Sequence, residues 1–470
     1  MRYIGHFKDT LLRLRKLVFR YATIILQKTM LTRRRFLNYS GGGILAIATG
    51  CRPEHINWLP HQEQATSTIN VALAEHAKFT KLKNLLLGYP INMNTPPKGF
   101  FTWRQQLLEA GIGGFSYNNV GNPFKDSPIV YNTHDFEQEL IHRFGKLYGF
   151  PAANTWGFLS NSGTDSNMHG MYMGRILLKG RTGELPKAYF TKEAHYSIQI
   201  LRDLLGLETV FVETLPDGGM DTHDLKKKLA DNSSHPALVI ATIGTTFKGA
   251  IDQLDHIQDA LKGYPSYLHL DAALFGGYLP HTQYADEVAY QSESNPNKAR
   301  FDSIAVSCHK FFGFPSPAGL FISTQNHFDE FNEFFSQIHN PEYIQHVPGT
   351  ITCSRDAVKP AEFYYFSSPT AMTKQQEDAF AILQNTTYLL DEMQSHFPDL
   401  QPVRANELSN TLFFRKPSDG IVEKYSLATM QLTINNTKQN YAHVVVMPHA
   451  NRKVLSEFLT DLEKDSTIHF

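Results

Sequence analysis

From Thr155 onward, short apolar runs alternate with longer amphipathic stretches, and this alternation limits the folds that the chain can adopt. The runs are rich in β-branched and aromatic residues, as buried strands are. Strands that alternate with helices build a mostly parallel sheet covered by helices. We therefore expect an α/β fold with strands at 156–159, 188–190, 210–212, 238–243, 267–270, 304–306 and 320–322.

The remaining stretches predict helices and a second, smaller domain. Asp221 suits an N-cap before the amphipathic stretch 223–229, and 254–261 has the same helical spacing. Beyond residue 335 a helix-rich stretch, 363–393, precedes three expected strands and a closing helix, at 411–415, 428–433, 442–446 and 454–462. We expect an export signal and linker (1–68), an N-terminal helical segment (69–110), a large domain (111–334) and a small C-terminal domain (335–470).

Lys310 follows the apolar run 304–306, and a charged side chain is unexpected so close to a buried strand. A buried ammonium is costly unless it is paired or neutralised, so an amine placed there is poised to lose its proton and act as a nucleophile. The alternative is a lysine whose stem lies along the strand end while its charge reaches water, and such lysines are commoner.

Two further motifs favour the functional interpretation of Lys310. Asp271 ends the apolar run 267–270, and Gly163-Thr164 follows Ser162 where a helix is expected to begin. A lysine for a Schiff base, an acid for a pyridinium nitrogen and a Gly/Ser/Thr turn for a phosphate are what pyridoxal phosphate needs from a protein. Because ligands of open α/β sheets gather beyond the carboxyl ends of strands, these groups are expected to converge. Asp271 as a mere turn cap is the alternative.

These segments resemble the pyridoxal-phosphate-dependent group II amino acid decarboxylases, in particular the branch of bacterial histidine decarboxylases and plant serine decarboxylases. The resemblance covers nearly the whole chain after residue 80. It rests on Gly88–Pro90, Tyr117–Asn119, Asn161, Gly163–Thr164, Thr191–Ser197, Ile243–Thr246, Asp271–Ala273, His309–Lys310, Ser354–Arg355 and Val446–His449. It implies an aminotransferase-like large domain (fold type I) with a mostly parallel sheet and a small C-terminal α+β domain.

The resemblance also implies residue roles. Lys310 would hold pyridoxal 5'-phosphate, Asp271 would face its ring nitrogen, and His195 would stack on the ring and orient or protonate the substrate. The other expected cofactor contacts are Ser162, Gly163, Thr164, Thr246 and His309, and the expected substrate contacts are His195, Tyr117, Asn118, Ser354 and Arg355. A lone histidine among 21 is by itself weak evidence, and Thr246 alone would read as a sheet-edge threonine. We expect no metal.

The implied reaction is decarboxylation of an L-amino acid, with histidine favoured over serine or an aromatic amino acid. Departures leave the substrate open: relatives commonly have Gly-Thr-Glu-Gly-Asn where this chain has Gly163-Thr164-Asp165-Ser166-Asn167, and Asp356-Ala357 replaces Asn-Gly. Arg355 keeps an aminotransferase in view, because those enzymes grip the α-carboxylate with an arginine. A surface protein that has kept only the fold is a further alternative.

The amino terminus resembles a twin-arginine export signal. Arg33-Arg34 precede Phe36-Leu37 and a short, glycine-rich apolar stretch, 41–48, that is far too short to span a bilayer. Cys51 lies in a lipobox-like context. We expect export to the periplasm or cell envelope, where a lipid on Cys51 would be the only membrane anchor of the mature protein. The alternatives are an ordinary basic run in a cytoplasmic protein and, for the basic residues 1–29, contact with an anionic membrane surface or a start at Met30.

Charge and cysteine content limit the partners. A formal net charge of −1 does not indicate the basic surface that binding of nucleic acid requires. Three cysteines cannot build a disulfide framework. The resemblance implies a homodimer in which the loop Tyr343–Arg355 contributes to the neighbouring site.

Overall fold

The computed structural model describes residues 62–292, 296–338, 340–344, 346–434 and 437–465. The predicted export signal therefore lies outside the described residues. The chain divides into two compact units, Met1–Lys78 and Phe79–Phe470, and both sheets and the candidate site lie in the second unit. In the described residues no helix is long and apolar enough to cross a membrane.

The helix expected to begin at Ile69 begins earlier, because α3 spans Gln62–Leu82 and is followed by a 3₁₀ turn, Lys83–Leu85. The end of the predicted linker 52–68 is thus helical, and that part of the prediction is wrong. Residues 62–68 are polar but contain no glycine or proline, so nothing in their composition interrupts a helix. The next helix, α4, spans Lys98–Glu109.

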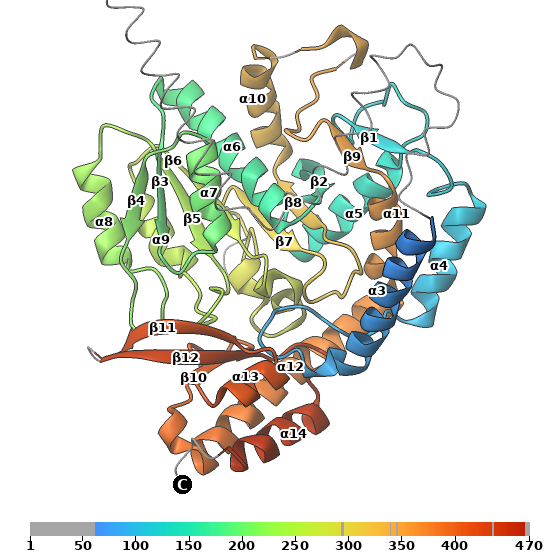
Figure 1. Ribbon diagram of the computed structural model, residues 1–470. Coiled ribbons are helices and arrows are strands. Elements are labelled where there is room, and N and C mark those ends of the chain that lie inside the picture. Colours follow the sequence, from blue (N-terminus) through green and yellow to red (C-terminus); the bar gives the residue numbers. More distant parts are fainter. Residues whose placement is uncertain (1–61, 293–295, 339, 345, 435–436, 466–470) are drawn as a thin grey trace, which may run out of the picture. The chain divides into compact units, whose positions relative to one another are not determined.

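A seven-stranded sheet forms the centre of the unit, with its strands in the order β2-β8-β7-β6-β5-β3-β4 (Figure 1). Only β8 runs antiparallel to its neighbours, so the sheet is mostly parallel, as predicted. Each of the seven predicted runs is a strand. Their bounds are β2 Trp156–Ser160, β3 Lys187–Thr191, β4 Thr209–Val212, β5 Ala237–Thr242, β6 Ser266–Asp271, β7 Ser303–Ser307 and β8 Gly319–Ser323.

Helices pack on the sheet because successive strand residues point to opposite faces. Along β5, Leu238 and Ile240 belong to one cluster of buried residues, and Val239 and Ala241 belong to another. The helices are α5 His134–Leu147, α6 Gly163–Thr182, α7 Tyr196–Leu204, α8 Thr222–Asp231, α9 Leu254–Leu261 and α10 Gln325–Ser336. The Asp221 carboxylate caps α8, as predicted, by accepting the backbone N–H groups of His223 and Asp224.

A smaller antiparallel sheet lies in the C-terminal part, in the order β10-β12-β11, and it contains the three strands predicted there. Its elements and the surrounding helices are α12 Pro369–His396, β10 Thr411–Arg415, α13 Asp419–Lys424, β11 Ala428–Ile434, β12 Thr437–Val445 and α14 Arg452–Glu463. The domain boundary after residue 334 stays a prediction.

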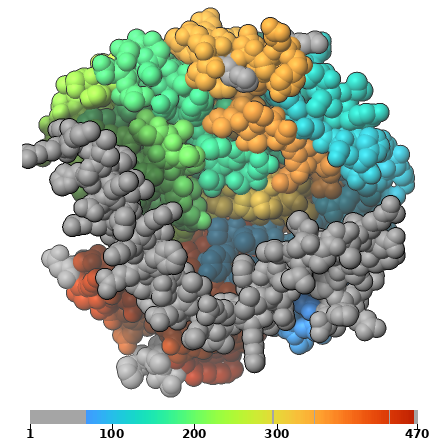
Figure 2. All heavy atoms as spheres, turned by 45° about the horizontal axis from the view of Figure 1, so that its top comes forward, coloured from blue at the N-terminus to red at the C-terminus, as the bar shows by residue number. Residues whose placement is uncertain are grey.

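A two-stranded ribbon joins distant parts of the chain. In it, β1 (Asn118–Val120) pairs with β9 (Ser354–Asp356), which is followed by α11 (Val358–Phe363). Figure 2 shows the cyan segment that carries β1 beside the orange segment that carries β9. The ribbon therefore ties residues after 334 to the large domain.

Candidate active site

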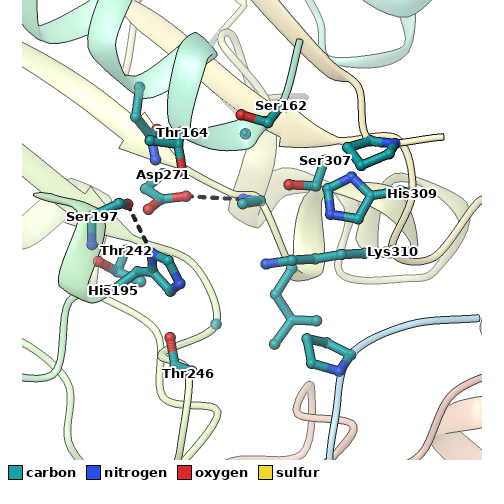
Figure 3. Close-up of a pocket in the computed structure, with 17 residues that line it drawn as sticks. Ser162, Thr164, His195, Ser197, Thr242, Thr246, Asp271, Ser307, His309 and Lys310 are labelled. Atoms are coloured by element: carbon teal, nitrogen blue, oxygen red, sulfur yellow. Dashed lines mark hydrogen bonds between the residues drawn. The ribbon is translucent and has the colours of Figure 1, made fainter. Parts of the chain in front are cut away.

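A cavity of ≈ 190 Å³ opens at the carboxyl edge of the large sheet. It lies beyond the ends of β2, β5, β6 and β7, where the sequence predicted a ligand site. Figure 3 shows its labelled side chains pointing toward one another from these separate strand ends. The eight predicted catalytic and cofactor residues all line it: Ser162, Gly163, Thr164, His195, Thr246, Asp271, His309 and Lys310.

Lys310 reaches the cavity from the turn that follows β7. Burial lowers the pKa of its amine, and the negative charge of Asp271 opposes that shift. Among the described residues, the Lys310 amine has no hydrogen-bonding or ion-pairing partner. Its backbone carbonyl accepts the N–H of Asn92 at 3.2 Å, which fixes the turn. The site thus offers an amine that gives up its proton more easily than an exposed lysine.

Asp271 is the last residue of β6 and is only 4% exposed. One of its oxygens, Oδ1, accepts the backbone N–H of Ala273 at 3.1 Å. Asp271 and Lys310 face the same cavity, yet their charged atoms are not within the 4 Å of an ion pair. The carboxylate of the buried Asp271 and the amine of the half-buried Lys310 are thereby held apart at the same cavity.

The N-terminus of α6 forms an anion cradle. Ser162 caps the helix by accepting the Asp165 N–H at 3.2 Å, while the N–H groups of Gly163 and Thr164 have no acceptor within the helix. A Cβ at Gly163 would lie 2.4 Å from Ser307 Oγ, so only glycine allows this close approach. The free N–H groups, the hydroxyls and the positive end of the helix dipole suit a phosphate.

His195 is the N-cap residue of α7, at the position predicted for it. Its Nδ1 lies 2.7 Å from Ser197 Oγ and accepts the Ser197 N–H at 3.3 Å. Burial lowers the pKa of His195 and the charge of Lys310 lowers it further, while Asp271 raises it. The ring is therefore neutral near neutral pH.

Thr246 and His309 complete the predicted set. Thr246 is exposed in the turn after β5, and Gly244 before it has φ +97°, which glycine tolerates best. His309 Nδ1 lies 3.3 Å from the Ala318 carbonyl, and burial lowers the pKa of its ring. Both line the cavity, but their individual roles remain predictions.

The lining residues that were not predicted as site residues include three with hydroxyl groups: Ser197, Thr242 and Ser307. Thr242 and Ser307 are the last residues of β5 and β7, so the rule that ligands gather at strand ends could have found them. Ser197 lies within the motif around His195, but only the helix start brings its hydroxyl to the ring. The Thr242 hydroxyl is buried without a hydrogen-bonding partner among the described residues.

The residues present fit pyridoxal phosphate. An anion cradle, the amine of the half-buried Lys310 and a buried carboxylate surround one cavity, and the last two are separated rather than paired. Each group matches one part of the cofactor: the phosphate, the aldehyde carbon and the ring nitrogen.

The four residues expected to contact the substrate besides His195 lie elsewhere in this chain. Tyr117 packs on Phe115, and Asn118 Nδ2 donates to Ser354 Oγ at 3.1 Å across the ribbon. These residues do not line the cavity of their own chain.

The prediction that Arg355 binds the substrate is wrong for this chain. Its guanidinium is buried, forms an ion pair with Glu137 and donates to the Gly121 carbonyl at 2.9 Å. It also lies over the Phe158 ring. Its charge therefore serves the core, because a buried cation needs a permanent partner. The aminotransferase alternative loses the arginine on which it rested.

The departure at Asp165 has a structural role. Its carboxylate accepts the Asn161 N–H at 2.9 Å and the Thr352 hydroxyl at 3.1 Å. Asp165 thus joins the turn before α6 to the segment that leads into β9.

Comparisons with known proteins show the family to which the chain belongs. Residues 125–362 match the pyridoxal-dependent decarboxylase conserved domain. Over 412 residues the chain is 30% identical to a histidine decarboxylase of Solanum lycopersicum, covering 86% of this chain and 90% of the relative. It is 32% identical over 391 residues to serine decarboxylase 1 of Oryza sativa subsp. japonica, covering 81% and 72%.

The fold is similar to that of solved decarboxylases. The crystal structure of L-methionine decarboxylase from Streptomyces sp. 590 superposes with a TM-score of 0.73, covering 87% of this chain and 96% of that one. Its sequence identity is 21%, so the similarity concerns the fold alone. The aminotransferase-like architecture expected from the sequence is confirmed.

Proposed function

Since this chain belongs to the family of pyridoxal-dependent decarboxylases, we propose that the amino acid it decarboxylates is L-histidine. The chain is a pyridoxal-phosphate-dependent amino acid decarboxylase, a carbon–carbon lyase, in keeping with the family match and the relatives. An aminotransferase and a non-catalytic surface protein are thereby set aside. Serine and an aromatic amino acid are the alternative substrates with which histidine has to be compared.

The residues divide the chemistry among them. Bound pyridoxal phosphate supplies an electron sink for the pair left when the bond to the carboxylate breaks. Lys310 would hold the cofactor, and the α6 N-terminus would hold its phosphate. The buried side chain of Asp271 would keep a proton on the ring nitrogen, which makes the ring a better acceptor of electrons. His195 would cover the ring and orient the substrate.

One observation favours histidine over serine. A second cavity of ≈ 310 Å³ shares Pro90, His195 and Thr246 with the first. Its other walls include Tyr196, Met430 and the polar Gln199. Aromatic and thioether walls with an amide suit an imidazole ring, whereas the hydroxymethyl group of serine would leave this space unfilled.

A substrate panel tests the proposal. The holoenzyme is incubated with L-histidine, L-serine, L-tyrosine and L-methionine, and carbon dioxide, amine and keto acid are measured. We expect histamine and carbon dioxide with the highest kcat/KM. A higher kcat/KM for L-serine would refute the substrate and leave the enzyme class intact.

We further propose that the working unit is a homodimer. Phe115, Tyr117 and Tyr131 form a cluster in which ring centroids lie 5.2–5.7 Å apart, and Phe115 and Tyr131 remain 55% and 53% exposed. Val130 beside them is 87% exposed. An exposed apolar cluster of this kind is typical of a protein interface. A second copy covering it would place Tyr117, Asn118 and Ser354 near the neighbouring site.

Light scattering tests the dimer. Tyr131→Glu places a charge in the cluster and should yield a monomer, whereas Tyr388→Glu, on α12, should leave the assembly unchanged. A wild-type monomer with full activity would rule out the dimer.

Export is proposed from the amino-terminal residues alone. Arg33-Arg34, the glycine-rich stretch 41–48 and Cys51 support delivery of the folded holoenzyme across the inner membrane and tethering through Cys51. Fractionation of cells expressing wild type and the Arg33→Lys/Arg34→Lys variant tests this. Wild type found in the cytoplasm with an intact amino terminus would refute export, and Cys51→Ala that keeps its membrane association would refute lipidation.

A further inference from the structure

The contact between His195 and Ser197 decides which ring nitrogen carries the proton. The backbone N–H of Ser197 points to His195 Nδ1 at 3.3 Å, and Ser197 Oγ lies 2.7 Å from the same atom. A backbone N–H can only donate, so Nδ1 is an acceptor and has no proton. The Ser197 hydroxyl then also donates to Nδ1. Neutral His195 therefore carries its proton on Nε2.

The surroundings hold this arrangement in place. Ser197 is 3% exposed and lies in the first turn of α7, so its hydroxyl cannot turn to water. Figure 3 shows the hydroxyl and the His195 ring in the wall below Asp271, with Thr246 on the other side of the ring. The Thr242 side chain lies in the same wall, and its hydroxyl group adds no charge beside the ring.

The charged groups around His195 come from several elements. Asp271 on β6 raises the pKa of the ring, whereas burial and Lys310 after β7 lower it. Glu193, two residues before His195, is held at 2.7 Å by Lys248 from the turn after β5, so these two charges largely offset each other. The net effect favours a neutral ring.

We propose that Ser197 is a positioning residue that holds His195 as the neutral Nε2–H tautomer, so that the ring offers the substrate α-carboxylate one uncharged donor. The inference rests on the decarboxylase function but holds for any amino acid substrate. It assigns no proton transfer to Ser197 and uses only a hydrogen bond at Nε2.

A neutral donor suits decarboxylation better than a cation. An imidazolium would bind the carboxylate strongly before the reaction and lose that interaction as carbon dioxide departs. Interactions that are stronger in the ground state than in the transition state slow the chemical step. A carboxylate that is oriented but poorly stabilised leaves more readily.

Nuclear magnetic resonance of the full chain without cofactor tests the tautomer. The protein is labelled with ¹⁵N-histidine, and the His195 signals are identified by their loss in His195→Gln. We expect a protonated Nε2 and an unprotonated Nδ1 in wild type and in Ser197→Thr, which keeps the hydroxyl. In Ser197→Ala only the weaker hydrogen bond from the backbone N–H to Nδ1 remains. Because the neutral ring loses the hydrogen bond from the hydroxyl, the pKa of His195 should rise by about half a pH unit.

Steady-state kinetics of the holoenzymes give the second test. As the pH falls toward the raised pKa of His195, both kcat and KM of Ser197→Ala should decrease. A charged ring binds the substrate carboxylate more tightly before the reaction, and this interaction is lost as carbon dioxide departs. Ser197→Thr should follow wild type. A wild-type His195 protonated on Nδ1 would overturn the inference. So would a Ser197→Ala protein whose tautomer, pKa and kcat and KM values all match wild type. The resonance experiment needs no substrate, so a wrong substrate assignment would not affect it.

Discussion

Glu137 and Arg355, 218 positions apart in the chain, form an ion pair whose side chains are 0% and 1% exposed. Glu137 lies on α5, and its carboxylate also accepts the Leu159 N–H at 2.8 Å and the Asn119 amide at 3.2 Å. One carboxylate thus joins α5, β2 and both strands of the ribbon. The pair fixes the ribbon to the large sheet.

Removing one partner of this pair should be strongly destabilising. Glu137→Gln leaves the Arg355 charge buried and unpaired, and we expect the free energy of unfolding to fall by about 3–5 kcal/mol. Urea unfolding of the holoenzyme measures it. Glu330→Gln breaks the Arg181–Glu330 pair, which is about one-third exposed, and should cost at most ~1 kcal/mol. Equal losses in the two variants would contradict this account.

Lys310→Ala should abolish cofactor attachment. Wild type is expected to be yellow because the lysine-bound cofactor absorbs visible light, and the variant should lose this absorbance and its activity. Lys262→Ala, an exposed lysine that lines neither of the two cavities, serves as the control and should keep both. An unchanged visible band in Lys310→Ala would exclude this lysine as the attachment residue.

Asp271→Asn should reduce kcat while leaving the fold intact. The amide keeps the shape of the buried side chain but cannot stabilise a proton on the ring nitrogen, so kcat should drop on the order of 10²–10⁴-fold. Cofactor absorbance and circular dichroism check that the variant is loaded and folded. A loaded variant with wild-type kcat would show that Asp271 has only a structural role.

Gly163→Ala should weaken cofactor binding through a steric clash. The added Cβ would lie 2.4 Å from Ser307 Oγ, and relieving such a contact costs about 1–3 kcal/mol, or roughly 5–150-fold in cofactor Kd. Equilibrium dialysis of the cofactor measures it. Ser307→Gly in the same chain removes the clashing atom and should recover part of the loss. Gly420→Ala, where the nearest atom to an added Cβ is Ser418 Oγ at 3.9 Å, should leave the cofactor Kd unchanged.

His169 should make the protein less stable in acid. It is buried among Trp156, Phe158, Phe321 and Phe331, neither ring nitrogen has a hydrogen-bonding partner among the described residues, and burial lowers its pKa to about 3. The unfolded chain takes up the proton near the usual pKa of 6.5, so this stability is complete above that pH and is lost as pH falls toward 3.

Urea unfolding at pH 7 and pH 5 measures the effect of His169. From its pKa difference, this residue should contribute about 2 kcal/mol to the loss between the two pH values. His169→Phe, which removes the titrating group and keeps a ring, should lessen the loss by that amount. His223→Phe, at an exposed position of α8, should leave the loss of stability unchanged. An equal loss in wild type and His169→Phe would contradict the assignment.

Local signals in the sequence were sufficient for much of the fold. The apolar runs predicted all seven strands of the large sheet because a buried strand must be apolar on both faces. Asp221 predicted its helix start because an N-cap needs a side-chain oxygen. The helix start at Gln62 was missed because polar residues without breakers are compatible with both a helix and a linker.

The sequence by itself determined the cofactor chemistry: Lys310, Asp271 and Gly163-Thr164 follow separate strands, and parallel strands carry such residues to one edge. Only the tertiary structure decided that Arg355 binds Glu137 and not a substrate, because the two residues lie 218 positions apart. In the sequence, an arginine that binds a substrate looks the same as one that pairs with a buried glutamate. The bond from Ser197 to His195 likewise depends on where α7 begins and how it packs. Residue type and spacing specify which groups are present, whereas packing between distant segments decides which of them face the cavity.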